Sequence, residues 1–312
     1  MIFRAATADP ADIDRALAYP ADGPVAALTA ERIREELDAH QFRTEWIWFA
    51  EDEGGEVLAR ALWWGRADSE RPIALDCLQV RASVADPGAL AAGLLAAGHA
   101  AFGNLPVYNI SLPRDWRTDP ELAAAVAWRQ EAAHEAGLTS DIERLRYEWT
   151  QEAGTTEPGG RLVFREGTDE EFLDAFVRLS SGSLDLHTQT ELRSMDAEQL
   201  AREDIEFYQD CPGERSWWRL AHLPDGTLAG MAIPSATPYH RNVGYLGVVP
   251  EQRGHGLIDE ILGEITRFHA AEGAERITAT TDTVNAPMAA AFDRAGYRVS
   301  EIRLVFEEPS GA

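Results

Sequence analysis

The 312-residue sequence predicts a mixed α/β fold, built as two tandem copies of one unit. Short apolar or β-branched runs of strand length alternate with longer segments whose apolar residues recur at helical spacing. Similar segments also recur in the same order in the two halves of the chain. A polar stretch containing Gly and Pro lies between the halves. We therefore expect a first domain at residues 1–150, a linker at 151–160 and a second domain at 161–312.

Four pairs of similar segments define the repeat. They are residues 3–7 and 164–168, 46–50 and 217–221, 135–138 and 294–297, and 144–148 and 303–307. Chance can supply any one of these pairs. Four pairs in the same order indicate that the chain contains two copies of one αβ unit.

The second half shows the clearer pattern of elements. Its predicted strands are residues 162–164, 217–222, 227–233, 243–249 and 276–281, and its predicted helices include 169–179, 197–208 and a helix that begins at 257. Asp225 and Gly226 form a strong turn signal, so the second and third strands should make a hairpin. This order of elements predicts a mixed sheet with helices packed on it.

The most informative stretch joins the strand at 243–249 to the helix that follows. Gly254 and Gly256 lie in a turn at the N-terminus of that helix, where the first backbone N–H groups lack intrahelical partners and the helix dipole favours negative charge. Main-chain atoms of the turn can therefore hold a phosphate or pyrophosphate. The alternative is a tight strand-to-helix connection without a ligand.

Two common phosphate-binding motifs do not fit this turn. A nucleotide triphosphate loop requires Lys followed by Ser or Thr after the last glycine, and Leu257 and Ile258 stand there instead. A dinucleotide-binding fold requires three glycines near the first strand and an acidic residue about twenty positions later, and the chain meets neither condition. The turn is therefore predicted to be neither a nucleotide triphosphate loop nor a dinucleotide-binding loop.

The stretch resembles the acyl-CoA loop of the GNAT superfamily of N-acetyltransferases, whose pattern is Arg/Gln-x-x-Gly-x-Gly/Ala after a strand ending in Val-x-Pro. Arg253, Gly256 and the lead-in at 248–250 match this pattern, whereas Ile258 replaces the final Gly/Ala. The resemblance covers roughly residues 161–308 and implies a GNAT-like acyl-CoA N-acyltransferase fold. It also implies acetyl-CoA as co-substrate and direct transfer of its acetyl group to a primary amine of a small molecule or peptide.

The resemblance further implies which residues contact the coenzyme. They lie on the central strand, in the loop after it and in the last helix with its preceding turn: Leu246, Gly247, Val248, Val249, Arg253, Gly254, His255, Gly256, Leu257, Ile258, Asn285 and Phe292. Asn285 is expected to reach the pantetheine arm. It also suits a helix cap, and the two roles do not exclude each other.

The first half lacks this loop. Its counterpart of the central strand, residues 75–80, is followed by 81–88 rather than by an Arg-x-x-Gly-x-Gly sequence. Asp86 and Pro87 suit a helix cap and a first helical turn instead. We expect a degenerate GNAT-like domain there, and the alternative is a first half that retains coenzyme binding in altered form.

The side chains that would catalyse acetyl transfer are less well defined by the sequence. Many GNAT enzymes carry a glutamate on the central strand and a tyrosine in the last helix, and the matching positions here are Gly244 and Phe292. The candidates for acid–base roles are His187, Tyr239 and His240, with Asp282 or ordered water as further options. The acceptor amine is expected near Asp185, Leu186, His187, Tyr239, His240 and Tyr245. A non-catalytic acyl-CoA-binding sensor or scaffold is the alternative function.

Composition narrows the classes of partner. The chain carries 28 Lys and Arg against 53 Asp and Glu, a formal net charge of −25, so we expect neither nucleic acid nor a membrane surface as a partner. Only Cys77 and Cys211 are present, without metal-ligand spacing, and the eight His residues are scattered, so we expect no metal.

The compartment is also inferred from the sequence. The N-terminus lacks a secretory pattern, and no apolar run of about 18 residues occurs, which predicts a cytoplasmic protein. The oligomeric state stays open, with a homodimer among the options.

Overall fold

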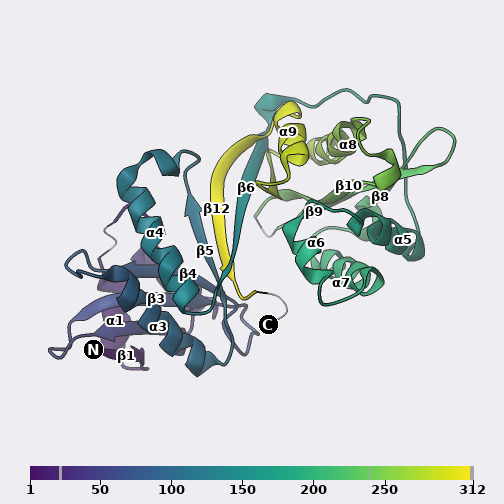
Figure 1. Ribbon diagram of the computed structural model, residues 1–312. Coiled ribbons are helices and arrows are strands. Elements are labelled where there is room, and N and C mark those ends of the chain that lie inside the picture. Colours follow the sequence, from purple (N-terminus) through teal and green to yellow (C-terminus); the bar gives the residue numbers. More distant parts are fainter. Residues whose placement is uncertain (21–22, 238, 310–312) are drawn as a thin grey trace. The chain divides into compact units, whose positions relative to one another are not determined.

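The chain forms two compact units (Figure 1). Unit 1 contains Met1–Glu143 together with Ile302–Pro309, and unit 2 contains Arg144–Glu301. The computed structural model describes residues 1–20, 23–237 and 239–309. Strands and helices alternate in both units, so the expected mixed α/β fold is confirmed.

The sheet of unit 1 has the strand order β1-β2-β3-β4-β5-β12. Its neighbours pair antiparallel except β4 and β5, which are parallel. The strands are β1 (Ile2–Ala5), β2 (Ile47–Glu51), β3 (Val57–Trp64), β4 (Ala74–Val80), β5 (Val107–Leu112) and β12 (Arg298–Glu307). The helices are α1 (Pro10–Ala18), α2 (Ala30–Asp38), α3 (Pro87–Phe102) and α4 (Pro120–Glu135).

The sheet of unit 2 has the strand order β6-β11-β10-β9-β8-β7, with β10 and β11 as its parallel pair. The strands are β6 (Ser140–Thr150), β7 (Val163–Arg165), β8 (Arg219–His222), β9 (Leu228–Ala236), β10 (Arg241–Val248) and β11 (Arg276–Asp282). The helices are α5 (Asp169–Ser180), α6 (Leu186–Glu191), α7 (Ala197–Asp210), α8 (Leu257–Ala271) and α9 (Ala286–Arg294).

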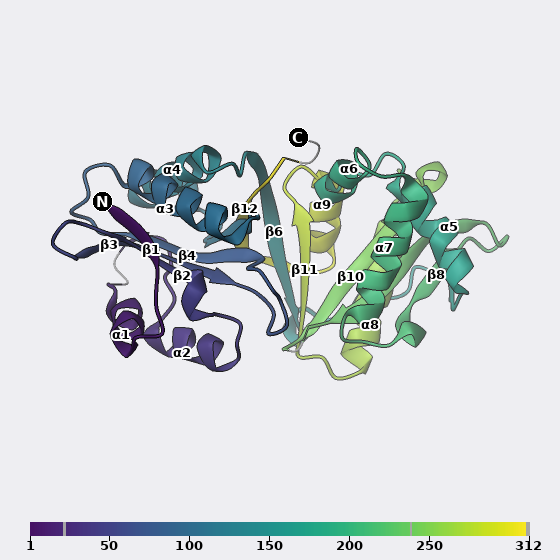
Figure 2. The ribbon, with the colours of Figure 1, turned by 90° about the horizontal axis from the view of Figure 1, so that it is seen from below.

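Each unit takes its last strand from the other half of the sequence. Residues 144–150 of β6 pair antiparallel with β11, as Figure 2 shows, and therefore belong to unit 2. Residues 302–306 of β12 pair antiparallel with β5 in unit 1. The unit bounds thus differ from the expected domains at 1–150 and 161–312. Apart from this exchange, the two units share one strand order, as the internal repeat predicts.

Helices cover both faces of the unit 2 sheet. Adjacent residues of β9 point to opposite faces, so Ala232 joins the core beneath α8 and α9, whereas Met231 and Ile233 join the core beneath α5 and α7. On α8 the buried large apolar side chains are Leu257, Ile261, Leu262 and Ile265. Each such side chain contributes about 1.5–3 kcal/mol when fully buried, so this apolar stripe anchors α8, including its first turn.

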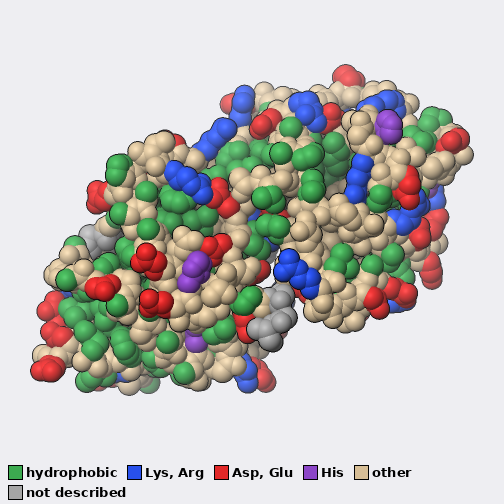
Figure 3. All heavy atoms as spheres, in the orientation of Figure 1, with side chains coloured by type: hydrophobic (Ala, Val, Ile, Leu, Met, Phe, Trp, Pro, Cys, Tyr) green, Lys and Arg blue, Asp and Glu red, His purple; other side chains and the backbone are tan. Residues whose placement is uncertain are grey.

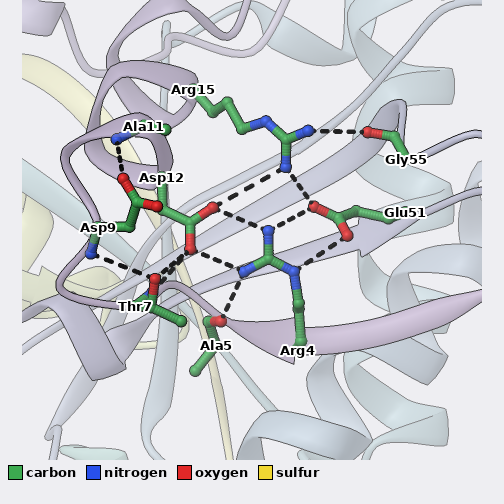
Figure 4. A network of polar contacts seen from close by, with 9 residues as sticks. All are labelled: Arg4, Ala5, Thr7, Asp9, Ala11, Asp12, Arg15, Glu51 and Gly55. Carbon is green, nitrogen blue, oxygen red and sulfur yellow. Dashed lines mark hydrogen bonds and ion pairs between the residues drawn. The ribbon is translucent and has the colours of Figure 1, made fainter.

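Unit 1 contains a polar network that ties β1 and β2 to α1 (Figure 4). The Arg4 guanidinium donates to both carboxylate oxygens of Asp12 at 2.9 and 2.8 Å and to both of Glu51 at 3.0 and 2.7 Å. Arg15 adds a bond to Glu51 at 2.8 Å. The hydrogen bonds from Arg4 hold the pKa of Asp12 well below its usual range. This network is a structural feature of unit 1, whereas the loop that the sequence singles out belongs to unit 2.

Candidate functional site

A β-bulge opens one edge of β10. The register between β9 and β10 shifts between Asn242 and Tyr245, and Gly244 takes a φ of +66°. A Cβ at Gly244 would lie 2.2 Å from the carbonyl oxygen of Ile233, so only glycine fits there. The parallel partner β11 pairs with β10 only at Arg241 and Asn242. Among the residues that the structure describes, no strand therefore pairs with this edge of β10 beyond Asn242.

Strand alternation shows which backbone groups face this open edge. The Val249 N–H donates to Ala229 at 2.9 Å, on the β9 side. Because successive residues of a strand direct their backbone groups to opposite sides, the N–H and C=O groups of Leu246 and Val248 face the open edge. The Val248 carbonyl agrees with this assignment, because it accepts a hydrogen bond from Arg253 Nε at 3.1 Å.

The loop after β10 leads directly into the N-terminus of α8. Gly254 and Gly256 have φ values of +80° and +69°, and Gly256 is the residue that precedes the first helical turn. A Cβ at either glycine would meet no atom within 4 Å, so open space lies beside both. The first N–H groups of α8 have no intrahelical acceptor, and the helix dipole favours an anion there.

Arg161 fixes the orientation of this loop from the opposite side. Its guanidinium donates to the carbonyl oxygens of His255 and Gly256 at 2.8 and 3.0 Å and also bonds Glu260. The Arg161 backbone N–H donates to the second oxygen of Glu260 at 3.1 Å. The loop carbonyls are thereby turned away from the anion site. The sequence interpretation placed Arg161 only at the start of the second domain and missed this role.

Arg253 joins the loop to the segment between α5 and α6. Besides Val248, its guanidinium donates to the carbonyls of Gly182 and Leu179 at 2.9 and 3.0 Å. Three of its five N–H groups are therefore used by the protein itself. The side chain lines the pocket described next, and its main contacts position the walls of that pocket.

A pocket of about 450 Å³ lies beside the open edge of β10 and the loop. Its walls come from the α5–α6 connection, β10, the loop, the first turn of α8 and the first turn of α9. The lining residues are Leu179, Gly182, Ser183, Leu184, Tyr245, Leu246, Gly247, Val248, Gln252, Arg253, Gly254, Gly256, Leu257, Ile258, Asn285, Pro287 and Met288. The pocket thus combines an apolar wall, an unpaired backbone edge and a helix N-terminus.

All but three of the residues expected to contact coenzyme line this pocket. Val249 is fully buried in the core beneath α5. His255 turns its ring back to the Gln252 carbonyl, with Nδ1 at 3.2 Å. Phe292 is 1% exposed and stacks on Tyr147 with ring centroids 4.7 Å apart, so it packs in the core beneath α9 instead of in the pocket wall.

Asn285 caps α9 and also lines the pocket. Its Oδ1 accepts a hydrogen bond from the Met288 N–H at 3.3 Å and so caps α9. The same residue lines the pocket opposite β10. The cap fixes the side chain at the pocket wall.

The structure separates the three candidate acid–base residues. Tyr239 is 79% exposed in the turn before β10. His240 lies at the start of β10, roughly 20 Å of strand away from Leu246, and burial together with Arg276 and Arg146 lowers its pKa. His187 lies on α6, close to the pocket wall, with Nδ1 3.9 Å from Glu191. Of the three, only His187 lies on an element next to the pocket.

Asp282 is 1% exposed, and both of its carboxylate oxygens are occupied. One accepts from Arg144 Nε at 3.1 Å, and the other accepts from the Leu186 N–H at 2.7 Å. Burial raises its pKa. These contacts attach the N-terminus of α6 to the end of β11, so Asp282 positions the pocket wall.

Sequence reasoning missed a group of side chains on α7. The Tyr208 hydroxyl donates to the Gly244 carbonyl in the bulge at 3.4 Å, and its ring packs edge-on against Tyr245 with centroids 6.0 Å apart. Asp204 precedes Tyr208 by one helical turn, and burial raises its pKa to about 6. The four-residue spacing of Asp204 and Tyr208 was the available signal, but the exposed acidic residues of this helix obscured it.

Comparison with known proteins identifies the class. The model of the acetyltransferase (GNAT) family matches residues 184–297, which contain the bulge, the loop and α9. No curated protein matches the chain. The segment 184–297 is therefore a GNAT acetyltransferase domain, a family whose chemistry is acyl transfer.

Solved structures agree at the level of the fold. A GCN5-related N-acetyltransferase from Sphaerobacter thermophilus is 17% identical, with a TM-score of 0.54, over 97% of this chain and 94% of that one. A conserved protein of unknown function from Staphylococcus epidermidis is 10% identical, with a TM-score of 0.52, over 84% and 95% of the two chains. The first of these spans both units of the present chain.

Two features of the described residues concern membranes and metals. Among residues 1–20, 23–237 and 239–309, no helix has both the length and the apolar character needed to cross a membrane. The same residues contain no group of three or more His, Cys, Asp and Glu side chains that is placed to hold a metal ion.

Proposed function

We propose that the protein is an N-acetyltransferase that transfers the acetyl group of acetyl-CoA directly to a primary amine of a small molecule or peptide. The observation that carries the proposal is the continuity of the unpaired β10 edge with the N-terminus of α8, along one pocket wall. An extended chain ending in a pyrophosphate is complementary to this combination. Acetyl-CoA has that chemistry, and it is the co-substrate that the family commonly uses.

In this arrangement, the loop N–H groups at Gly254 and Gly256 and those of the first turn of α8 hold the pyrophosphate. The pantetheine amides pair with Leu246 and Val248 as a short added strand. The thioester then lies near Tyr245, at the bulge. A backbone N–H on the open edge polarises the thioester carbonyl as negative charge develops on its oxygen.

The reaction requires few catalytic side chains. A neutral amine held against the thioester reacts at a rate set largely by positioning, and a base that removes its proton adds to that rate. The positions of Gly244 and Phe292 provide neither the glutamate nor the tyrosine that many family members carry. The proton acceptor must therefore come from another element.

Release of CoA thiol tests the proposal. The purified chain is incubated with acetyl-CoA and, in turn, kanamycin, spermidine, glycine and tri-alanine, and free thiol is measured over time. We expect at least one amine to accelerate thiol release above the rate of hydrolysis, with a mass increase of one acetyl group on that amine. Binding of acetyl-CoA without thiol release in any mixture would instead support the sensor function.

A further inference from the structure

One carboxyl group lies on α7, one helical turn before a tyrosine that contacts the bulge in β10. Asp204 and Tyr208 are four residues apart on α7, so both side chains lie on the same face of the helix. Tyr208 contacts the Gly244 carbonyl and the Tyr245 ring, and Tyr245 lines the pocket. The Asp204 charge acts on the hydroxyls of both tyrosines. Asp204 therefore lies one helical turn from Tyr208, which packs against the pocket-lining Tyr245 at the bulge.

The surroundings of Asp204 leave its carboxylate available. The side chain is partly buried, and within the described residues it makes no hydrogen bond or ion pair. The titratable groups that face it are His187, Asp185 and Glu191 on α6, Glu203 and Tyr208 on α7, and Tyr245 on β10. Burial raises its pKa to about 6, where a carboxylate is a competent base at neutral pH.

Two other acidic groups nearby already accept hydrogen bonds from the protein. Asp185 Oδ1 accepts from the N–H and the hydroxyl of Thr188 at 2.8 and 3.0 Å and so caps α6. Both oxygens of Asp282 are bonded to Arg144 and Leu186.

The two tyrosines at this end of the pocket cannot serve as the base. Burial raises the pKa of Tyr208 and of Tyr245, so both stay neutral phenols at pH 7. Among the carboxylates near the bulge, Asp204 is thus a partly buried one that, within the described residues, caps no helix and pairs with no cation.

We propose that Asp204 is the catalytic base that accepts the proton of the acceptor amine, an assignment that rests on the acetyltransferase function proposed above. The lone pair of the amine nitrogen forms the new C–N bond at the thioester carbon, and the C–S bonding pair leaves with sulfur. The nitrogen's proton passes to the Asp204 carboxylate. The thiolate takes a proton from water, and the products are the amide and CoA thiol.

Asp204→Asn tests this assignment, because it keeps the shape of the side chain and removes the base. Glu206→Gln is the matched control, since it removes one carboxylate from an exposed position on the same helix. Thiol release is measured with kanamycin, spermidine, glycine and tri-alanine between pH 5 and 9. We expect kcat of the wild type to rise through about pH 6, and the Asn variant to lose that rise and about 100-fold in kcat. The acetyl-CoA Kd should stay unchanged in both variants.

Thermal unfolding gives a readout that does not depend on the acceptor. The native pKa of Asp204 lies above the ordinary value near 4, so the native state loses stability as pH rises from about 4 through 6. Asp204→Asn should therefore melt at a higher temperature than the wild type at pH 7, and the difference should vanish below pH 4. Glu206→Gln should show no such pH-dependent gain.

The outcomes separate the two proposals. Undiminished turnover in Asp204→Asn overturns the assignment of the base and leaves the acetyltransferase function intact. A lower melting temperature at pH 7 for that variant also overturns it, because it shows a carboxylate that stabilises the fold. If the wild type releases no thiol with any of the four amines, both proposals fail.

Discussion

At the scale of single residues, the anion site depends on arginines whose guanidinium groups bind main-chain carbonyls of the protein. Arg253 and Arg161 each bond two or more main-chain carbonyls around the loop. The carbonyls of His255 and Gly256, which Arg161 holds, therefore do not repel an anionic ligand at the N-terminus of α8. The loop therefore presents N–H groups because neighbouring side chains hold its C=O groups elsewhere.

Arg161→Ala should weaken coenzyme binding although Arg161 does not line the pocket. The change removes two hydrogen bonds to the loop, each worth about 0.5–1.5 kcal/mol, so we expect acetyl-CoA affinity to fall about tenfold. Isothermal titration calorimetry measures the loss. Arg165→Ala is the control, because Arg165 pairs with the exposed Glu171 and does not touch the loop. Equal affinities for the two variants would show that Arg161 has no positioning role.

The residue scale also shows what could be predicted from the sequence. The loop was predictable because Gly254, Gly256 and the helix after them are adjacent in the chain, and their backbone requirements are local. Arg161 was not, because it lies 94 residues from the His255 carbonyl that it binds. Asp204 was obscured for a similar reason, since titratable groups that interact with it lie on other elements, α6 and β10.

At the scale of elements, the bulge in β10 creates the open edge. The strand itself was predicted, but the glycine in it was noted only as the position of a missing glutamate. The structure explains why glycine occupies this position. Gly244 has a positive φ, and a Cβ there would lie 2.2 Å from the carbonyl oxygen of Ile233. The predicted acid–base residues Tyr239 and His240 belong to the same strand and turn, but the strand carries them away from the pocket. A sequence pattern assigns residues to a strand, but it does not show which end of that strand lies beside the pocket.

Gly244→Ala should be much more destabilising than a glycine substitution at a turn. Gly226→Ala is the control, because Gly226 also has a positive φ of +88° but no atom within 4 Å of its Cβ position. The turn variant should lose about 1 kcal/mol in the free energy of unfolding, the ordinary cost of this conformation. The bulge variant should lose more, because its Cβ collides with backbone. Urea denaturation followed by tryptophan fluorescence compares them, and equal losses would contradict the packing at the bulge.

At the scale of the whole molecule, the duplication could be predicted from the sequence, but the exchange of the last strand between the two units could not. Residues 144–148 and 303–307 resemble each other, so either segment suits the last position of either sheet. Which sheet each joins is decided by long-range pairing, here β6 with β11 and β12 with β5. The net charge of −25 likewise describes the whole chain, and on the face drawn in Figure 3 acidic side chains occur in several places among Lys and Arg.

The exchange predicts that the halves cut at the expected linker are not independent domains. A fragment of residues 1–150 lacks the strand that pairs with β5, and a fragment of 161–312 lacks the strand that pairs with β11. Each would expose an unpaired sheet edge, so we expect both to be unfolded or aggregated when expressed alone and folded when coexpressed. Circular dichroism and size-exclusion chromatography test this. Two monomeric fragments, each with cooperative unfolding, would refute the exchange.

The central claim is that the loop before α8 in unit 2 binds acetyl-CoA, and calorimetry on one pair of variants tests it. Gly256→Asp places a carboxylate at the anion site, and Gly273→Asp places one at the other end of α8, where the glycine also has a positive φ of +80° and open space beside it. We predict that the wild type and Gly273→Asp bind acetyl-CoA with one site and equal affinity, and that Gly256→Asp shows no binding while keeping the same fold. Unchanged affinity in Gly256→Asp would contradict the account.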